Sequence, residues 1–348
     1  METKTQPLPE KQEVAVIGAG SWGTALAQHL GRQGHEVRLW VYEPELLATL
    51  QRQQENTLFL PGVQLSANIR FVGQVEEAAA GVAIIVMATP SHVFRQVLSL
   101  LPPAEPRART IVGASKGIEN ETLLTMEGVV REVLGVECPY AILSGPSFAK
   151  EVAQGQPTVV TVASRQRLVA KAIQRLFSSP IFRVYTTFDV TGVEIGGALK
   201  NIMALGTGIL EGLGLGANPR AALITRGLAE IIRLGARLGA NPMTLAGLSG
   251  LGDLVLTCTS TQSRNYRVGV QLGAGDKIAD ILAKMKMVAE GVKTAAAAHF
   301  LSQKLGVEMP IVEQVYRILY EEQPARQAVK TLMTRELKDE IDAMAESW

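Results

Sequence analysis

A lysine within a long apolar segment is a candidate general acid or base. Lys200 lies in the apolar stretch from Ile195 to Ala217. Burying a lysine is costly unless it is paired or used, and burial lowers its pKa toward the range of a general acid or base. Asp253, in Gly-Leu-Gly-Asp-Leu, is a carboxylate that could orient Lys200. The alternatives are that Lys200 extends to solvent and that Asp253 caps a helix.

The tripeptide Ser263-Arg264-Asn265 offers a hydroxyl, a forked guanidinium and an amide in succession. These groups suit a phosphate monoester, because one arginine can donate two hydrogen bonds to it at once. A surface turn with a solvated arginine explains the tripeptide equally well.

Two more polar segments follow predicted strands. Lys116 stands in Ser-Lys-Gly, and Gly145 and Ser147 stand in Ser-Gly-Pro-Ser. The carboxyl ends of strands in an open α/β sheet face the ligand crevice. Lys116 could therefore bind an anionic substrate or polarise a carbonyl, or it could be a solvated loop lysine. Ser147 could contact a ligand or cap the next helix.

A glycine-rich turn predicts a nucleotide site near the start of the chain. Gly18-Ala19-Gly20-Ser21-Trp22-Gly23 follows the apolar run Val14-Ala15-Val16-Ile17 and precedes a helical pattern. In a strand–turn–helix unit, Gly18 permits the sharp turn, Gly20 lets the backbone approach a pyrophosphate, and Gly23 lets helix and strand pack closely. The helix N-terminus then faces the phosphates.

The elements around these residues predict two domains. Eight apolar, strand-like runs occupy the first half of the chain, at residues 14–17, 36–42, 69–72, 82–88, 110–114, 140–143, 158–163 and 182–186. Helical patterns alternate with several of them, at 22–33, 92–100, 123–134 and 167–177. Alternation of this kind predicts a parallel, doubly wound, Rossmann-like sheet over residues 13–188. Only helical patterns follow, at 190–210, 220–238, 276–286, 293–305, 311–320 and 325–332, so residues 189–348 are predicted to form an all-α domain.

Composition excludes several classes of function. The 348 residues include 34 Lys and Arg and 33 Asp and Glu, a balance that favours neither nucleic acid nor an anionic membrane as partner. No apolar stretch is free enough of charge to span a membrane, and no metal-ligand spacing stands out. Residues 1–12 are polar and lack the apolar core of a signal peptide, so we expect a disordered tail. The two distant cysteines, Cys138 and Cys258, indicate a reducing, cytoplasmic compartment.

The ordered motifs together resemble the bacterial-type, NAD(P)-dependent glycerol-3-phosphate dehydrogenases, from Val14 to about Glu340. The resemblance rests on the segments at residues 18–25, 90–94, 115–117, 145–151, 199–201, 250–258 and 262–265. It implies reduction of dihydroxyacetone phosphate by NAD(P)H to sn-glycerol 3-phosphate, the backbone precursor of glycerophospholipids. The expected partner is thus a small phosphorylated substrate, and a homodimer is one assembly that the chain could adopt.

The resemblance also implies roles for individual residues. Lys200 matches the proton acceptor of alcohol oxidation. The substrate-binding positions are matched by Lys116, Gly145, Ser147, Lys200, Asp253, Ser263, Arg264 and Asn265. The cofactor contacts are matched by the cradle residues Gly18, Gly20, Ser21, Trp22 and Gly23, and by Tyr42, Lys116, Ala149, Arg264, Val288 and Glu290.

Tyr42 is one departure from the family pattern, which usually has Arg or His at that position. A basic residue there would favour the 2′-phosphate of NADPH, and Arg38 is a weak substitute. Glu43 could bind a ribose hydroxyl or open the next helix. The sequence therefore leaves the choice between NAD and NADP open.

Two other functions remain as alternatives. One is a related two-domain dehydrogenase of the β-hydroxyacid or 6-phosphogluconate type, which the segments at residues 250–254 and 262–265 argue against. The other is a regulator that binds NAD(P) without chemistry, which an intact Lys200 and Asp253 argue against.

Overall fold

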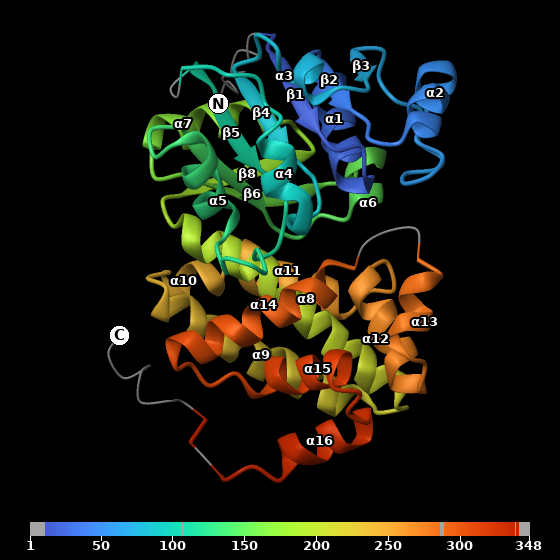
Figure 1. Cartoon of the computed structure of the whole chain (residues 1–348), viewed down its shortest axis with the longest axis vertical. Coiled ribbons are helices and arrows are strands. Elements are labelled where there is room, and N and C mark those ends of the chain that lie inside the picture. Colours follow the sequence, from blue (N-terminus) through green and yellow to red (C-terminus); the bar gives the residue numbers. More distant parts are fainter. Residues whose placement is uncertain (1–10, 106–107, 286–288, 338, 341–348) are drawn as a thin grey trace, which may run out of the picture.

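The chain folds into a sheet with helices on both faces, followed by a helical half that lies below it in Figure 1. The computed structural model describes residues 11–105, 108–285, 289–337 and 339–340. The tail expected at residues 1–12 lies almost wholly outside this range, as does the expected cofactor contact Val288. In the described part of the chain, no helix is both long and apolar enough to cross a membrane.

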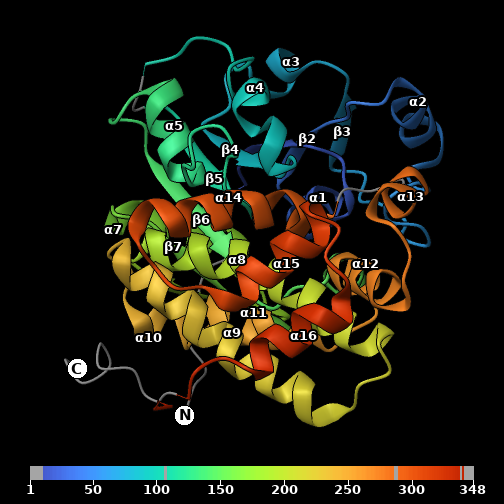
Figure 2. The same ribbon diagram turned by 60° about the horizontal axis from the view of Figure 1, so that its bottom comes forward.

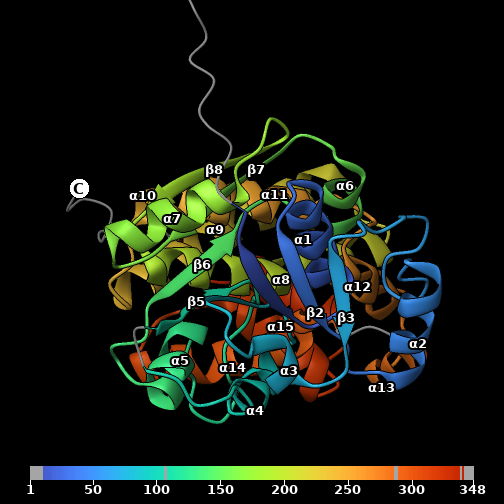
Figure 3. The ribbon, with the colours of Figure 1, turned by 90° about the horizontal axis from the view of Figure 1, so that it is seen from above.

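The sheet has eight strands in the order β3-β2-β1-β4-β5-β6-β7-β8, which Figure 3 shows from above. All eight predicted strands are present, and the Rossmann-like fold is confirmed. Their bounds are β1 (Glu13–Ile17), β2 (Glu36–Trp40), β3 (Ile69–Val72), β4 (Ile84–Met87), β5 (Thr110–Gly113), β6 (Tyr140–Ser144), β7 (Thr158–Ala163) and β8 (Phe182–Thr187). Strands β1 to β6 are parallel, so the turns after β1, β4, β5 and β6 meet at one edge.

The last two strands run the other way, which the predicted parallel pattern does not include. β7 pairs antiparallel with β6, and β8 pairs parallel with β7. The only helix between β6 and β7 is α6 (Ala149–Gln154). Six helical residues span about 9 Å, whereas a five-residue strand spans about 17 Å, so α6 by itself does not carry the chain back to the starting edge. β7 begins beside the end of β6 and runs back along it.

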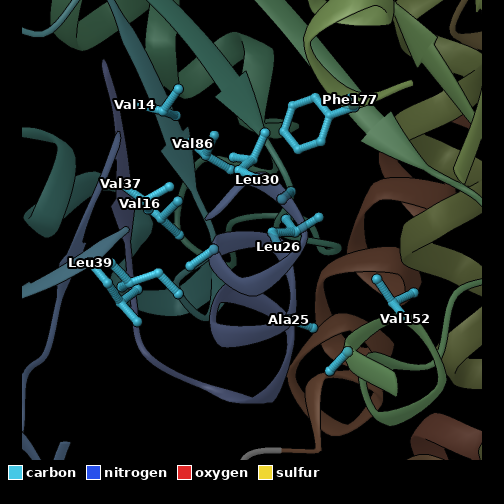
Figure 4. Close-up of a cluster of buried hydrophobic side chains, with 14 of the residues drawn as sticks. Val14, Val16, Ala25, Leu26, Leu30, Val37, Leu39, Val86, Val152 and Phe177 are labelled. Carbon is cyan, nitrogen blue, oxygen red and sulfur yellow. The ribbon is translucent and has the colours of Figure 1, made fainter. Parts of the chain in front are cut away.

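Alternating strand residues bury both faces of the sheet. On one face, Val14, Val16 and Val86 pack against the helices α1 (Ser21–Arg32) and α7 (Arg167–Phe177), whose Leu26, Leu30 and Phe177 are drawn in Figure 4. On the other face, Ala15, Ile17 and Ile85 pack with the helices α3 (Val75–Ala79), α4 (Phe94–Leu98) and α5 (Met126–Leu134). Burial on both faces explains why the strands are continuously apolar.

The second half is helical, as predicted, and is built around one buried helix, α8 (Val190–Gly212). Figure 2 shows other helices of this half around it. They are α9 (Ala217–Arg237), α10 (Pro242–Leu245), α11 (Asp253–Cys258), α12 (Arg264–Ala274), α13 (Ile278–Ala283), α14 (Glu290–Leu305), α15 (Pro310–Tyr320) and α16 (Ala325–Met333). The periodicity analysis did not predict the short α10 and α11 or, more importantly, α12. In the first half no periodic pattern marks α2 (Pro44–Gln53), α3 or α6, although helices opening after Glu43 and after Ser147 are among the alternatives that the sequence offers.

Glycines allow α8 and α12 to cross at very short range. A Cβ added to Gly208 would lie 2.1 Å from the Tyr266 carbonyl oxygen, and one added to Gly269 would lie 2.2 Å from that of Leu205. No real Cβ tolerates such distances, so the two backbones touch directly. This crossing fixes α12, which begins with Arg264, against the helix that carries Lys200.

We expect Gly269→Ala to lower the free energy of unfolding by about 3 kcal/mol, the upper end of the range for overpacked cores. The reason is that the new methyl group would meet backbone, which cannot rotate away as a side chain can. Gly216→Ala is the matched control, because no atom lies within 4 Å of a Cβ added there. It should cost less than about 1 kcal/mol. Urea unfolding of both variants measures the difference, and equal midpoints would contradict the prediction.

Candidate active site

The glycine turn after β1 has the geometry of a dinucleotide cradle. Gly18 has φ +115°, and a Cβ there would lie 2.9 Å from the Ala88 carbonyl oxygen. A Cβ on Gly23 would lie 1.9 Å from the carbonyl oxygen of Gly18, so helix and turn are in contact. By contrast, no atom lies within 4 Å of a Cβ added to Gly20. The turn is thus closed on the protein side and open at Gly20, where a pyrophosphate would approach.

The polar groups around this opening fit a phosphate-bearing cofactor. Helix α1 begins at Ser21 with no acidic residue in its first turn, so its positive end is not neutralised. The Trp22 indole nitrogen and the Thr89 hydroxyl are buried and have no hydrogen-bond partner. Unpaired buried polar groups are expensive, and a ligand that bonds to them removes the cost.

A shared carboxylate joins the two lysines that the sequence singled out. Asp253 is 1% exposed, and its Oδ1 lies 2.5 Å from Lys200 Nζ while its Oδ2 lies 2.7 Å from Lys116 Nζ. Lys116 follows β5 in the sheet half, whereas Lys200 and Asp253 belong to the helical half. The Lys116–Asp253–Lys200 cluster therefore spans the two halves of the chain.

The Lys200 ammonium is held by a second oxygen. Lys200 Nζ donates to Thr257 Oγ1 at 2.8 Å, and the Thr257 hydroxyl donates to the Asp253 carbonyl oxygen at 2.6 Å. A five-residue π-helical turn, Leu248–Gly252, leads directly into Asp253. Sequence reasoning missed Thr257. Its position four residues after Asp253, on the same face of α11, is the signal that could have found it.

Burial gives Lys200 an unusual acidity. Desolvation lowers its pKa from 10.5 to about 8, and the positive charge of Lys116 adds to this effect, while Asp253 opposes it. An amine with a pKa near 8 can both release and accept a proton near neutral pH.

Arg264 lies at the start of α12, and none of the described residues holds its guanidinium. Within the described part of the chain, its guanidinium forms no hydrogen bond or ion pair. Burial lowers its pKa, and the charge of Glu290 partly opposes this. Ser263 is the cap of the same helix, and its Oγ accepts a hydrogen bond from Tyr266 N at 3.2 Å. A largely buried arginine without a counter-ion, on a helix N-terminus, is suited to bind an anion.

Asn265 serves the framework around this arginine. Its Nδ2 donates to Asn201 Oδ1 at 2.9 Å, and its Oδ1 accepts from Gly291 N at 2.9 Å. One amide proton is left for a ligand. The expected substrate contact of Asn265 is therefore compatible with the geometry, but most of its hydrogen bonds join α8, α12 and α14.

The turn after β6 brings Gly145 and Ser147 to the cluster. Gly145 has φ +147°, a Cβ there would lie 2.9 Å from Val160 Cα, and its carbonyl oxygen accepts from Lys116 Nζ at 3.4 Å. Ser147 Oγ donates to the same carbonyl oxygen at 2.9 Å. Ser147 does not cap the next helix, because the residue before Ala149, the first of α6, is Phe148.

Glu290 reaches across to the sheet half. Its carboxylate accepts from Ser91 Oγ at 2.6 Å and from Ser91 N at 3.2 Å, and burial raises the pKa of this carboxyl. Ser91 begins the short 3-10 turn Ser91–Val93 after β4. The sequence marks residues 90–94 only as a segment of the family resemblance, and it gave no sign of the bond to Glu290.

Tyr42 lies away from the lysine cluster, just beyond the end of β2. Its side chain is 76% exposed. Glu43, next to it, is the residue that precedes α2, so it does open a helix as one reading of the sequence has it.

Comparison with known proteins agrees with this geometry. Residues 13–170 match the family described as NAD-dependent glycerol-3-phosphate dehydrogenase N-terminus, and residues 189–330 match the corresponding C-terminus family. A glycerol-3-phosphate dehydrogenase [NAD(P)+] of Geobacter metallireducens is 57% identical over 331 residues, which cover 94% of this chain and 99% of the relative. One from Myxococcus xanthus is 53% identical over 329 residues, with 94% and 98% covered.

Solved structures lead to the same family. A glycerol-3-phosphate dehydrogenase of Coxiella burnetii superposes with a TM-score of 0.89 at 40% identity, covering 93% of this chain and 99% of the other. A yeast glycerol-3-phosphate dehydrogenase gives a TM-score of 0.79 at 29% identity, with 93% and 99% covered.

The two family matches span both halves of the chain, and the cradle and the lysine cluster lie within them. This chain therefore belongs to the NAD-dependent glycerol-3-phosphate dehydrogenase family.

Proposed function

We propose that this chain reversibly reduces dihydroxyacetone phosphate to sn-glycerol 3-phosphate with NAD(P)H, and so supplies the backbone of glycerophospholipids. The observation that carries the proposal is the buried Lys116–Asp253–Lys200 cluster beside a dinucleotide cradle. Two ammonium groups and one carboxylate leave a net positive charge, which suits an anionic substrate and an oxygen that gains negative charge during reduction.

The cofactor would be held by the cradle and the turns beside it. The backbone around Gly18, Gly20 and Gly23 and the first amides of α1 are suited to the pyrophosphate. When bound, the nicotinamide supplies the hydride that reduces the carbonyl carbon. We assign Ser21, Trp22, Lys116, Ala149, Arg264 and Glu290 to the surroundings of the cofactor.

Lys200 is assigned as the proton donor in reduction and the proton acceptor in oxidation. An ammonium has three protons, and Lys200 gives one to Asp253 and one to Thr257. The third can therefore be donated to the substrate oxygen. Asp253 and Thr257 position Nζ so that little rearrangement is needed when the proton moves.

Arg264 and Ser263 are assigned to the substrate phosphate. Arg264 has no partner among the described residues, and the hydroxyl proton of Ser263 is not used in capping α12. Holding the phosphate fixes the carbonyl near Lys200, so binding energy far from the reacting carbon is converted into orientation. Lys116, Gly145, Ser147 and Asn265 complete the proposed substrate cage.

We also infer a cytoplasmic enzyme, since both cysteines, Cys138 and Cys258, are buried free thiols, as a reducing compartment allows. That the protein forms a homodimer remains a prediction, and a measurement of its molecular mass in solution tests it.

We expect Lys200→Met to lower kcat for dihydroxyacetone phosphate reduction by about 100-fold or more, the usual contribution of a positioned acid or base. Methionine fills a similar volume without the proton, and Asp253 keeps its pair with Lys116. Steady-state kinetics measure the loss, and the melting temperature verifies the fold. Near-normal turnover would exclude Lys200 as the proton donor.

The two directions of the reaction should respond oppositely to pH. Reduction needs the Lys200 ammonium, so its kcat should fall as the pH rises through about 8, the pKa that burial gives this amine. Oxidation needs the neutral amine, so its kcat should rise over the same range. Rate profiles at saturating substrate test both, and a reduction rate that increases through pH 8 would contradict the assignment.

Arg264→Ala should raise KM for dihydroxyacetone phosphate by about 10- to 100-fold, because a hydrogen-bonded charge pair contributes about 1.5–3 kcal/mol. Arg267→Ala, on the exposed side of α12, is the matched control and should leave KM nearly unchanged. Equal KM values for the two variants would place the phosphate elsewhere.

A further inference from the structure

We propose that this enzyme selects NADH over NADPH, because, among the residues that the structure describes, the place that would receive the adenosine ribose presents carboxylates and no available cation. The inference rests on the proposed function. In a doubly wound sheet, the ribose lies at the carboxyl end of the second strand, beside the glycine turn. Here β2 pairs in parallel with β1, with Trp40 opposite Ile17, so the end of β2 lies next to that turn.

The residue at this place brings no positive charge. Tyr42 is 76% exposed, and its ring packs edge-on against Trp40, with centroids 6.0 Å apart. The Trp40 indole in turn donates to the Gly73 carbonyl oxygen at 3.2 Å, which ties the turn after β3 to the end of β2. The turns after β2 and β3 therefore form one surface.

This surface is acidic. Glu43 and Glu45 stand at the start of α2, and Glu76 and Glu77 stand in the first turn of α3. A helix N-terminus normally attracts phosphate, but the two carboxylates at the start of α2 counter that attraction. Residues 41–45 and 73–77 include no lysine or arginine.

The nearest arginines on these strands are already bonded. Arg38 Nε donates to Glu13 Oε1 at 2.7 Å, and its Nη1 donates to the carbonyl oxygens of Glu77 and Ala80. Arg70 pairs with Glu77 at 2.6 Å. Recruiting either one to a 2′-phosphate would break these bonds. Arg52, in the last turn of α2, is about 12 Å along the helix from Pro44.

The two cofactors would meet opposite conditions here. The 2′-phosphate of NADPH carries a charge of about −1.5 to −2 at neutral pH, and the carboxylates of Glu43, Glu45 and Glu76 would repel it, whereas the charge of Glu77 is compensated by Arg70. The 2′-hydroxyl of NADH is neutral and can donate a hydrogen bond to a carboxylate, for which Glu43 is the candidate. Specificity thus comes from repulsion of one ligand as much as from attraction of the other.

The test is calorimetric titration of the full-length protein with NADH and with NADPH, without substrate. We expect NADH to bind at least about tenfold more tightly, and kcat/KM for dihydroxyacetone phosphate reduction to favour NADH to a similar degree. The difference should shrink as salt is raised from about 0.05 to about 0.5 M, because salt screens exposed charges. Equal affinities, or tighter NADPH binding, would overturn the inference.

Tyr42→Arg should tighten NADPH binding by about tenfold and so reduce or reverse the preference, because the guanidinium can pair with the 2′-phosphate. Gln53→Arg adds the same charge at the exposed far end of α2 and should leave the ratio of the two affinities unchanged. Equal shifts in both variants would mean that net charge alone sets the ratio, which would overturn the role of this surface.

Failure of the proposed function gives a different result. Selective NADH binding without reduction of dihydroxyacetone phosphate would support the selectivity and overturn the proposed substrate. Binding of neither cofactor, in protein with a cooperative melting transition, would overturn both.

Discussion

The shared carboxylate of Asp253 is the interaction on which the site depends. Two ammonium groups this close would repel each other, and the buried Lys200 would pay a desolvation cost of several kcal/mol. Asp253 pairs with both, and it does so from the helical half toward a lysine in each half of the chain. The ion pairs that hold the two lysines in the site therefore also join the two halves of the chain. Neither half alone contains a complete site.

Close backbone contacts hold this arrangement in place. On α8, Gly208 and Gly212 touch α12, and a Cβ added to Gly197 would lie only 2.9 Å from Ser144 Oγ at the end of β6. Gly18 and Gly23 likewise allow close backbone contacts in the turn after β1. Backbone contacts cannot relax by side-chain rotation, so Lys200 is fixed relative to Arg264, and the cradle is fixed relative to the strands of the sheet. Precise placement of this kind is what proton transfer and phosphate anchoring require.

The pKa of Lys200 shows why burial and function are linked here. The same desolvation that makes an apolar helix an expensive place for a lysine brings its pKa down to about 8. Asp253 opposes the effect enough to keep the lysine mostly charged near neutral pH. The balance between desolvation, to which the charge of Lys116 adds, and the attraction of Asp253 sets the acidity. The sequence offered burial of Lys200 and a partner in Asp253 as possibilities, and only the tertiary structure shows both.

The sequence by itself determined the eight strands, the glycine cradle, the change to helices near residue 189 and the identity of the polar residues, because these depend on local periodicity and on residue type. It missed α12 and the reversed direction of β7 and β8, because both are decided by contacts and distances between elements. Only the tertiary structure shows that Lys116 pairs with Asp253 and that Lys200 donates a hydrogen bond to Thr257. It also shows that Ser91 donates to Glu290 and that Arg38 donates to Glu13. These pairs join residues up to 199 positions apart, and spacing along a chain does not encode which side chains meet across a packed interface.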